Sequence, residues 1–130
     1  MILVDTHVVV WLAFDETRIS KKARLAIETE RQNGEGVAVS DISLFELARI
    51  FNREHTRLAI GVELTLAEIE RRFVVLPITG RISLLALSLS ADYPKDPADR
   101  IIGATALVHG MPLVTADRQI RNSHALLTIW

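Results

Sequence analysis

The chain has 130 residues, of which 49% are hydrophobic and 24% are charged, and its formal net charge is -1. This length suits one domain over residues 1–130, and the composition is typical of a folded globular protein rather than a disordered one. The near-neutral charge excludes binding to nucleic acid through overall basicity, so any such binding needs local patches. The absence of Cys excludes a disulfide framework, a thiolate zinc site and a thiol nucleophile.

Neither a secretion signal nor a membrane span is indicated. Asp5 and His7 interrupt the N-terminal apolar stretch, and no cationic segment precedes it. The longest stretch without Asp, Glu, Lys or Arg is Ile101–Ala116. It is shorter than the roughly 20 apolar residues that a membrane helix needs, and His, Gly and Pro interrupt it. We therefore expect a soluble, cytoplasmic protein without a membrane partner.

The first third of the chain predicts two strands, one helix and one segment that fits either structure. Ile2–Val4 is a short apolar run of the kind that forms a buried parallel strand. Val8–Leu12 is compatible with a strand, because it is rich in β-branched residues, or with a helix capped by the preceding Asp-Thr. A serine cap and a terminal Asn-Gly delimit a helix over Lys21–Gln32. Val37–Val39 predicts the second strand.

The middle of the chain predicts two helices around an irregular stretch. A helix should begin at Ser40 or Asp41 and reach about Arg53. His55–Gly61 has no regular pattern and predicts a loop. The sequence Thr65–Glu68 has the form of a capping box, which predicts the start of another short helix.

The last part of the chain continues the alternation of strands and helices. Val74–Leu76 predicts a third strand and Ile82–Ala91 a helix. Asp96-Pro97 supplies a cap and a first-turn proline for a helix that ends at His109-Gly110. The final expected strands are Leu113–Thr115 and, at the edge, Leu127–Ile129. Short apolar strands alternating with helices predict a three-layer α/β/α domain with a central parallel sheet of four to five short strands.

Four acidic residues interrupt, end or border these apolar runs: Asp5, Glu46, Asp99 and Asp117. A carboxylate in such a place loses hydration, so a fold excludes it unless it has a partner or a purpose. A shared purpose for four carboxylates from distant parts of one chain is to hold a divalent cation. The sequence therefore predicts a metal-dependent active site.

Topology places three of these acids at one edge of the sheet and leaves the position of Asp99 open. Asp5 and Asp117 directly follow strands, so both belong at the carboxyl edge of the sheet, where functional groups gather in open α/β folds. Glu46 lies about a turn and a half into its helix and can lean toward the same edge. Asp99 is in the first turn of the helix before the fourth strand, and its placement is less determined, because a helix that leads into a strand usually starts at the opposite edge. The residues alone therefore leave the placement of Asp99 open.

Converging carboxylates repel one another, so in the absence of a cation at least one has a raised pKa. An all-oxygen site suits Mg²⁺, with Mn²⁺ as a substitute. Such an ion bridges carboxylates to a phosphate and lowers the pKa of water. No Ser-His or Cys-His nucleophilic pair is indicated, so the pattern favours phosphodiester hydrolysis by activated water.

Four segments carry a resemblance to a known family. They are, in chain order, Leu3-Val4-Asp5-Thr6-His7, Ser43-Leu44-Phe45-Glu46-Leu47-Ala48, Asp96-Pro97-Ala98-Asp99-Arg100-Ile101-Ile102-Gly103-Ala104-Thr105-Ala106 and Leu113-Val114-Thr115-Ala116-Asp117-Arg118. This ordered set resembles the PIN-domain ribonucleases and, within them, the toxins of VapBC toxin–antitoxin pairs. With the terminal Trp130 it covers essentially the whole chain.

The resemblance implies that the four acids form one catalytic and metal-binding site that cleaves RNA. It places Asp99 with the other three and favours a helix for Val8–Leu12. It also implies a homodimer and a small antitoxin protein that wraps the chain and blocks its acidic site.

Polar neighbours of the acids have two interpretations each. Thr6 and Thr115 carry hydroxyls that could orient a carboxylate or a water, or they could be an ordinary cap and strand residue. Asp96 is expected to cap its helix, and an indirect role at the metal is the alternative.

Each acid also has an ordinary structural interpretation. Asp5 could be a helix cap, and Glu46 could pair with Arg49. Asp99 could oppose the helix dipole, and Asp117 could be a turn residue.

Two other function classes remain open from the residues. A metal-dependent phosphatase or phosphotransfer domain also carries Asp at strand ends. A haloacid-dehalogenase-like site needs an Asp two residues after the first, and His7 occupies that position. A non-catalytic binding module with this fold would be expected to lack one or more of the acids, and all four are present.

Overall fold

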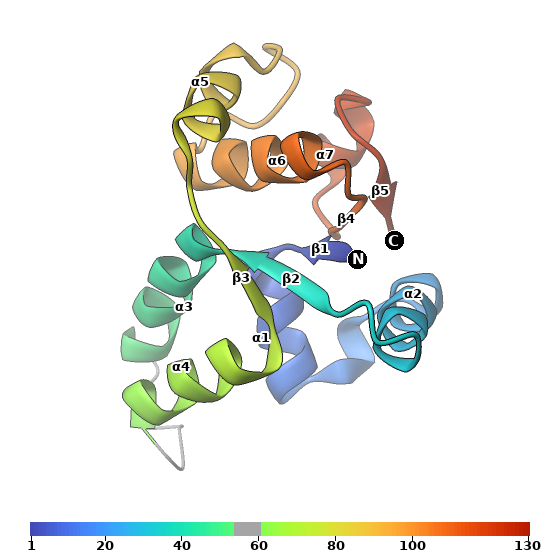
Figure 1. The fold of residues 1–130 in the computed structure, drawn as a ribbon, viewed down its shortest axis with the longest axis vertical. Helices are drawn as coiled ribbons and strands as arrows, with labels where there is room; N and C mark the ends of the chain where they lie inside the picture. The colour runs from blue at the N-terminus through green and yellow to red at the C-terminus, as the bar shows by residue number, and fades with distance from the viewer. Residues whose placement is uncertain (54–60) are drawn as a thin grey trace.

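The computed structural model describes residues 1–53 and 61–130 (Figure 1). Five parallel strands form one sheet in the order β3-β2-β1-β4-β5. They are β1 (Ile2–Val4), β2 (Val37–Ser40), β3 (Val74–Leu76), β4 (Leu113–Val114) and β5 (Thr128–Ile129). Helices cover both faces of the sheet, so the predicted three-layer α/β/α architecture with a parallel sheet is confirmed, and the expected edge strand is present.

The centre of the sheet is its most apolar part. Leu3 of β1 is aligned with Ala38 of β2 on one side and with Leu113 of β4 on the other. All three side chains are fully buried. A strand covered on both faces cannot alternate polar and apolar residues, which explains the continuous apolar runs seen in the sequence.

One face of the sheet packs against four helices, drawn below it in Figure 1. They are α1 (Thr6–Phe14), α2 (Lys21–Gln32), α3 (Asp41–Arg53) and α4 (Gly61–Arg72), with the short 3₁₀ helix η1 (Glu16–Arg18) between α1 and α2. Ile2 and Val4 of β1 meet Val9, Ile27 and Leu47 in this core.

The other face is covered by the C-terminal helices, drawn above the sheet in Figure 1. They are α5 (Gly80–Ser88), α6 (Pro97–His109) and α7 (Arg118–Ser123). Leu3 packs here against Ile102 of α6, Ile120 of α7 and Tyr93 of the α5–α6 connection. Helix α5 packs on the outside of α6 through Ile82, Ala86 and Ala104.

Several predicted boundaries require correction. The capping-box interpretation of Thr65 is wrong, because α4 begins four residues earlier and the Thr65 hydroxyl donates to the Gly61 carbonyl (2.7 Å) inside the helix. The predicted helix Ile82–Ala91 begins at Gly80, since Thr79 accepts from Ile82 N as its cap, and it ends at Ser88. The ambiguous Val8–Leu12 segment is helical, as the resemblance implied.

Two further predictions concern the loop at His55–Gly61 and the lack of a membrane-spanning helix. The loop expected at His55–Gly61 lies outside the described residues except for Gly61, which begins α4. Within residues 1–53 and 61–130, none of the helices combines the length and apolarity that crossing a bilayer requires.

Candidate active site

Asp5 lies at the junction of β1 and α1. It is the N-cap of α1, where its Oδ1 accepts from Thr6 N at 2.8 Å. Its other oxygen, Oδ2, accepts from Thr115 Oγ1 at 2.7 Å. Only 7% of Asp5 is exposed, so these donors replace part of the hydration that the carboxylate loses. One oxygen of Asp5 therefore serves the helix cap, and the other is held by Thr115.

Thr6 links the start of α1 to Glu46 of α3. Its Oγ1 donates to Glu46 Oε1 at 2.6 Å and is hydrogen-bonded with Ser43 Oγ at 2.9 Å. One hydroxyl proton serves one acceptor, so Ser43 donates to Thr6 while Thr6 donates to Glu46. Ser43 and Glu46 are three residues apart in α3 and share a face of the helix. This arrangement turns the half-buried Glu46 toward Asp5, as the sequence suggested.

Asp117 follows β4 and begins α7. Its Oδ1 accepts from Ile120 N at 2.9 Å, and its own N–H donates to Thr115 Oγ1 at 3.1 Å. Asp117 is thus the cap of a helix that the sequence did not predict, rather than an ordinary turn residue. Because Thr115 also donates to Asp5, one hydroxyl connects the two strand-end acids.

Asp99 lies in the first turn of α6. Asp96 caps this helix through Oδ1, which accepts from Ala98 N (2.9 Å) and Asp99 N (3.1 Å). The last turn of α6, at His109, leads directly into the amino end of β4. A helix of 13 residues is about 20 Å long, so its first turn lies at the other, carboxyl edge of the sheet. The residues alone leave the placement of Asp99 open, and the structure puts the first turn of α6 at the same edge of the sheet as Asp5 and Asp117.

The charges of all four acids contribute to the pKa shifts at this site. Burial, followed by the charges of Asp5, Asp96, Glu46 and Asp117, raises the pKa of the Asp99 carboxyl to about 7. Burial also raises the pKa of Asp5, while its hydrogen bonds to Thr115 and Thr6 act in the opposite direction. The pKa of Glu46 is raised by burial first and then by the Asp5 charge. The structure therefore brings carboxyl groups from four separate segments within electrostatic range of one another.

Comparison with known protein families decides the family of this chain. The model described as "PIN domain" matches residues 2–124. The chain belongs to the PIN-domain family. Ribonuclease VapC22 of Mycobacterium tuberculosis is 37% identical to it over 131 residues, which covers 99% of this chain and 98% of the relative.

Solved structures share the fold of this PIN domain at low sequence identity. One is VapBC2 from Rickettsia felis bound to a DNA fragment from its promoter, with a TM-score of 0.73 and 16% identity. Another is a toxin–antitoxin complex from Klebsiella pneumoniae, with a TM-score of 0.69 and 21% identity. Each match covers 98% of this chain and 97% of the other.

The donor set of this PIN domain suits a hard cation. The four side chains offer only carboxylate oxygens, with the Thr6 and Thr115 hydroxyls holding two of them. In the part of the chain that the structure describes, no three acidic or imidazole side chains are gathered closely enough to hold a metal ion.

Three residues of the site were not predicted from the sequence. Ser43 could have been found from its i, i+3 spacing to Glu46, which puts both on one helix face. Tyr93 and Gly103 gave no such signal, because their contact joins a loop to a helix. Tyr93 Oη donates to the backbone carbonyl of Asp99 at 2.9 Å.

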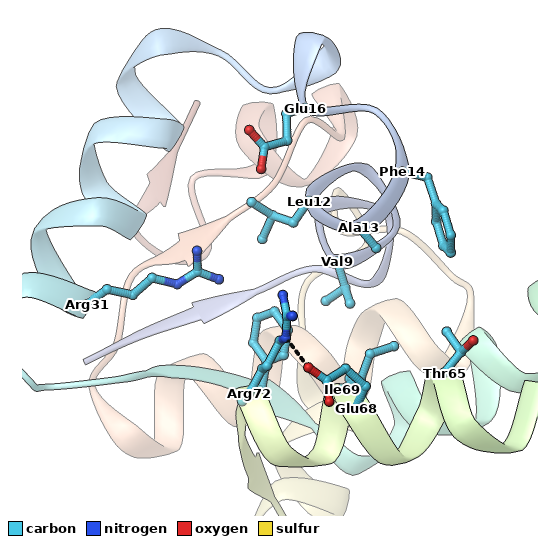
Figure 2. A pocket seen from close by; sticks show the side chains of 11 residues that line it. Val9, Leu12, Ala13, Phe14, Glu16, Arg31, Thr65, Glu68, Ile69 and Arg72 are labelled. Carbon is cyan, nitrogen blue, oxygen red and sulfur yellow. Dashed lines mark hydrogen bonds and ion pairs between the residues drawn. The ribbon is translucent and has the colours of Figure 1, made fainter. Parts of the chain in front are cut away.

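A groove of about 320 Å³ lies apart from the four acids, none of which lines it (Figure 2). Its lining is largely apolar and comes from α1 and α4, with Val9, Leu12 and Ile69 among its residues. Arg31 of α2 and Arg72 of α4 point into the groove from different sides, and Glu68 pairs with Arg72 at 2.5 Å. The groove therefore combines an apolar floor with charged walls, which is typical of a surface that receives a partner.

Proposed function

We propose that this PIN domain is a metal-dependent endoribonuclease that hydrolyses RNA phosphodiester bonds and serves as the toxin of a toxin–antitoxin pair. The single observation that carries the nuclease proposal is that Asp5, Glu46, Asp99 and Asp117 lie within electrostatic range of one another at one edge of the sheet. Burial, followed by the charges of Asp5, Asp96, Glu46 and Asp117, raises the pKa of Asp99 to about 7, and a bound divalent cation would relieve the repulsion between these charges. The ribonuclease name of the 37% identical relative supports the choice of RNA.

We propose Mg²⁺ as the cofactor, with Mn²⁺ as a substitute, held by the four carboxylates. Oxygen-only donors favour these ions over zinc or copper. The chemistry that a divalent cation supplies in such sites is neutralised carboxylate charge, a lowered pKa of water and a stabilised leaving oxygen. In the hydrolysis, a water would give up one proton as its oxygen attacks phosphorus, the bond from phosphorus to the leaving ribose oxygen would break, and that ribose oxygen would take up one proton, so that protons balance.

The protein's own contribution is to hold carboxylates that would otherwise separate. Thr115 fixes one oxygen of Asp5, and Thr6 fixes one oxygen of Glu46. Asp96 supports Asp99 indirectly by capping the helix that carries it. Preorganised ligands of this kind need little rearrangement when a cation and a phosphate bind.

The test is cleavage of structured and unstructured RNAs by purified protein with Mg²⁺, Mn²⁺ or EDTA. We expect cleavage with either metal, none with EDTA and little in Asp5→Asn. Glu70→Gln, an exposed acid on α4, is the matched control and should cleave like the wild type. Cleavage in EDTA, or full activity in Asp5→Asn, would overturn the mechanism.

The same preparation separates the two other function classes. A phosphatase would release phosphate from a monoester such as p-nitrophenyl phosphate and leave internal RNA bonds intact. A non-catalytic module would bind RNA or metal without hydrolysing either substrate.

We propose that the partner is a cognate antitoxin and that the pair acts in the cytoplasm. The solved neighbours include toxin–antitoxin complexes, which supports a partner of this kind. The apolar groove between α1 and α4 offers a surface on which a partner's apolar side chains can be buried. Exposed Phe14 stands at its border and extends that surface.

Co-purification from the native operon tests this part separately. The chain should be recovered with a small protein that inhibits its cleavage of RNA. Ala13→Arg, an exposed substitution in the groove, should weaken that recovery. Ala67→Arg is the control, because Ala67 is exposed on α4 but does not line the groove. Recovery of the wild-type chain alone and active, without effect on growth, would contradict the antitoxin proposal.

A further inference from the structure

Tyr93 is a fully buried residue that contacts the first turn of α6. Its ring lies in the core between the sheet and α6, with Leu3, Ile102 and Leu113 in the same cluster. Its hydroxyl lies at the edge of this apolar core, where it donates to the Asp99 backbone carbonyl at 2.9 Å. The hydrogen bond therefore joins the α5–α6 connection to the residue whose carboxyl group completes the acidic cluster.

Gly103 provides the space for this contact. A Cβ atom at position 103 would lie 2.2 Å from Tyr93 Oη and 2.6 Å from Tyr93 Cζ, far inside van der Waals contact. Asp99 and Gly103 are four residues apart in α6 and so lie on the same face of the helix. The hydroxyl end of the Tyr93 ring therefore contacts the face of α6 that carries Asp99.

Arg100, which follows Asp99 in α6, is hydrogen-bonded to α5 and to the same connection. Its guanidinium donates to the carbonyls of Ala86 (2.8 Å), Pro94 (3.1 Å) and Leu89. Leu89 and Pro94 lie in the α5–α6 connection, on either side of Tyr93 in the sequence. Asp99 accepts from this connection and Arg100 donates to it, so the first turn of α6 is held to the loop in both directions.

We propose that Tyr93 is a positioning residue that fixes the first turn of α6, and thereby the direction in which Asp99 presents its carboxyl group to a bound divalent cation. The inference rests on the proposed function, because it assumes that Asp99 is one of the metal ligands. Tyr93 contributes no atom to the cation or the RNA. It acts through the Asp99 backbone.

The charge surroundings of Tyr93 agree with this position. Burial raises the pKa of the Tyr93 phenol well above its ordinary value, and the charges of Asp5, Asp99 and Asp117 raise it further. The hydroxyl therefore keeps its proton and remains a donor. The hydrogen bond to the Asp99 carbonyl places the hydroxyl end of the ring at the first turn of α6.

Tyr93→Phe tests the proposal because it keeps the buried ring and removes only the hydroxyl. We would measure Mn²⁺ binding to the protein by electron paramagnetic resonance, and the Mn²⁺ concentration that gives half-maximal RNA cleavage. Loss of a residue that orients a metal ligand typically weakens metal affinity by about tenfold or more. We expect a shift of about that size in both measurements, with cleavage at saturating Mn²⁺ close to the wild-type rate.

Thr105→Val is the matched control. Thr105 is fully buried on α6 and donates to the Ile101 carbonyl at 2.7 Å, so the substitution also removes a buried hydroxyl from a helical carbonyl. It should leave Mn²⁺ affinity unchanged. Amide hydrogen exchange in the metal-free proteins gives a second readout, because the first turn of α6 should exchange faster in Tyr93→Phe than in Thr105→Val.

Asp99→Asn separates failure of this inference from failure of the proposed function. If Asp99→Asn loses Mn²⁺ and Tyr93→Phe binds it like the wild type, the positioning role is overturned and the metal site stands. If Asp99→Asn itself binds Mn²⁺ normally, the proposed metal site is overturned. An equal loss of affinity in Tyr93→Phe and Thr105→Val would show a general effect of helix stability and would also overturn the positioning role.

Discussion

Thr115 Oγ1 donates to Asp5 Oδ2 at 2.7 Å, although the two residues are 110 positions apart in the sequence. Both are buried, and they stand at the carboxyl ends of the adjacent strands β4 and β1. Thr115 Oγ1 also accepts from Asp117 N at 3.1 Å. This hydroxyl therefore fixes the relative positions of two of the four proposed ligands, one from each end of the chain.

Thr115→Val should destabilise the protein through Asp5. Valine has nearly the shape of threonine, but it leaves the buried carboxylate with one donor fewer. Loss of a partner from a buried charged group costs about 1–3 kcal/mol, so the free energy of unfolding should fall by that amount in denaturant titrations. Thr105→Val is the control and should cost about 1 kcal/mol, because its partner is a neutral carbonyl. Equal stability of Thr115→Val and wild type would show that water replaces the lost donor.

Glu46→Gln should separate charge from structure in α3. The Gln side chain keeps a carbonyl oxygen that can accept from Thr6, so the fold and the melting temperature should change little. RNA cleavage should fall about 100-fold if the Glu46 charge helps to hold the cation, which cleavage rates at fixed Mg²⁺ would measure. Wild-type activity in Glu46→Gln would instead mean that Glu46 serves only to receive the Thr6 hydroxyl.

The fold followed from the sequence where local signals and burial agreed. The continuous apolar runs of β1 and β2 indicated strands covered on both faces, and Asp96-Pro97 and Gly110 marked both ends of α6. Prediction failed where one local pattern has two structural uses. The Thr65–Glu68 pattern matches a capping box, but α4 begins earlier, at Gly61, and Val62 in its first turn packs against the core.

Most of the candidate site could be predicted because strand ends are recognisable in sequence. Asp5 and Asp117 were placed by topology alone, and Glu46 by its helix position. Asp99 depended on the direction of α6 across the sheet, which the residues around it do not encode. The Tyr93–Gly103 contact was out of reach for a similar reason, since the space over a glycine is defined only by tertiary structure.

Asp99→Asn should stabilise the metal-free protein at neutral and higher pH. The pKa of Asp99 is about 7 in the folded state, above its ordinary value of 3.8, so the folded state binds the proton more tightly than the unfolded state. The wild-type stability associated with this group is complete below about pH 4 and is lost as the pH rises through about 7. Asparagine carries no charge at any of these pH values, so it removes this loss.

Thermal unfolding in EDTA between pH 5 and pH 8 would measure this difference. The melting temperature of Asp99→Asn should exceed that of the wild type by a few degrees at pH 8, since about 1 kcal/mol corresponds to roughly 3–5 °C for a domain of this size. The two proteins should converge toward pH 5. A saturating divalent cation should reverse the order, because it neutralises the acids only in the wild type. A constant difference at every pH would contradict the raised pKa of Asp99.

Leu87→Glu should disrupt self-association of the chain. Leu84 and Leu87 are three residues apart on α5, and 72% and 81% of their surfaces are exposed. Leu87 also borders a cavity of about 560 Å³ that Pro97 and Ile101 of α6 help to line. Adjacent exposed leucines beside an apolar recess are typical of an interface, so we expect the wild type to be a dimer and Leu87→Glu a monomer in sedimentation experiments. Leu25→Glu is the control, because Leu25 is 65% exposed on α2, across the sheet from α5. Dissociation by Leu25→Glu alone would assign the interface to α2 and contradict this prediction.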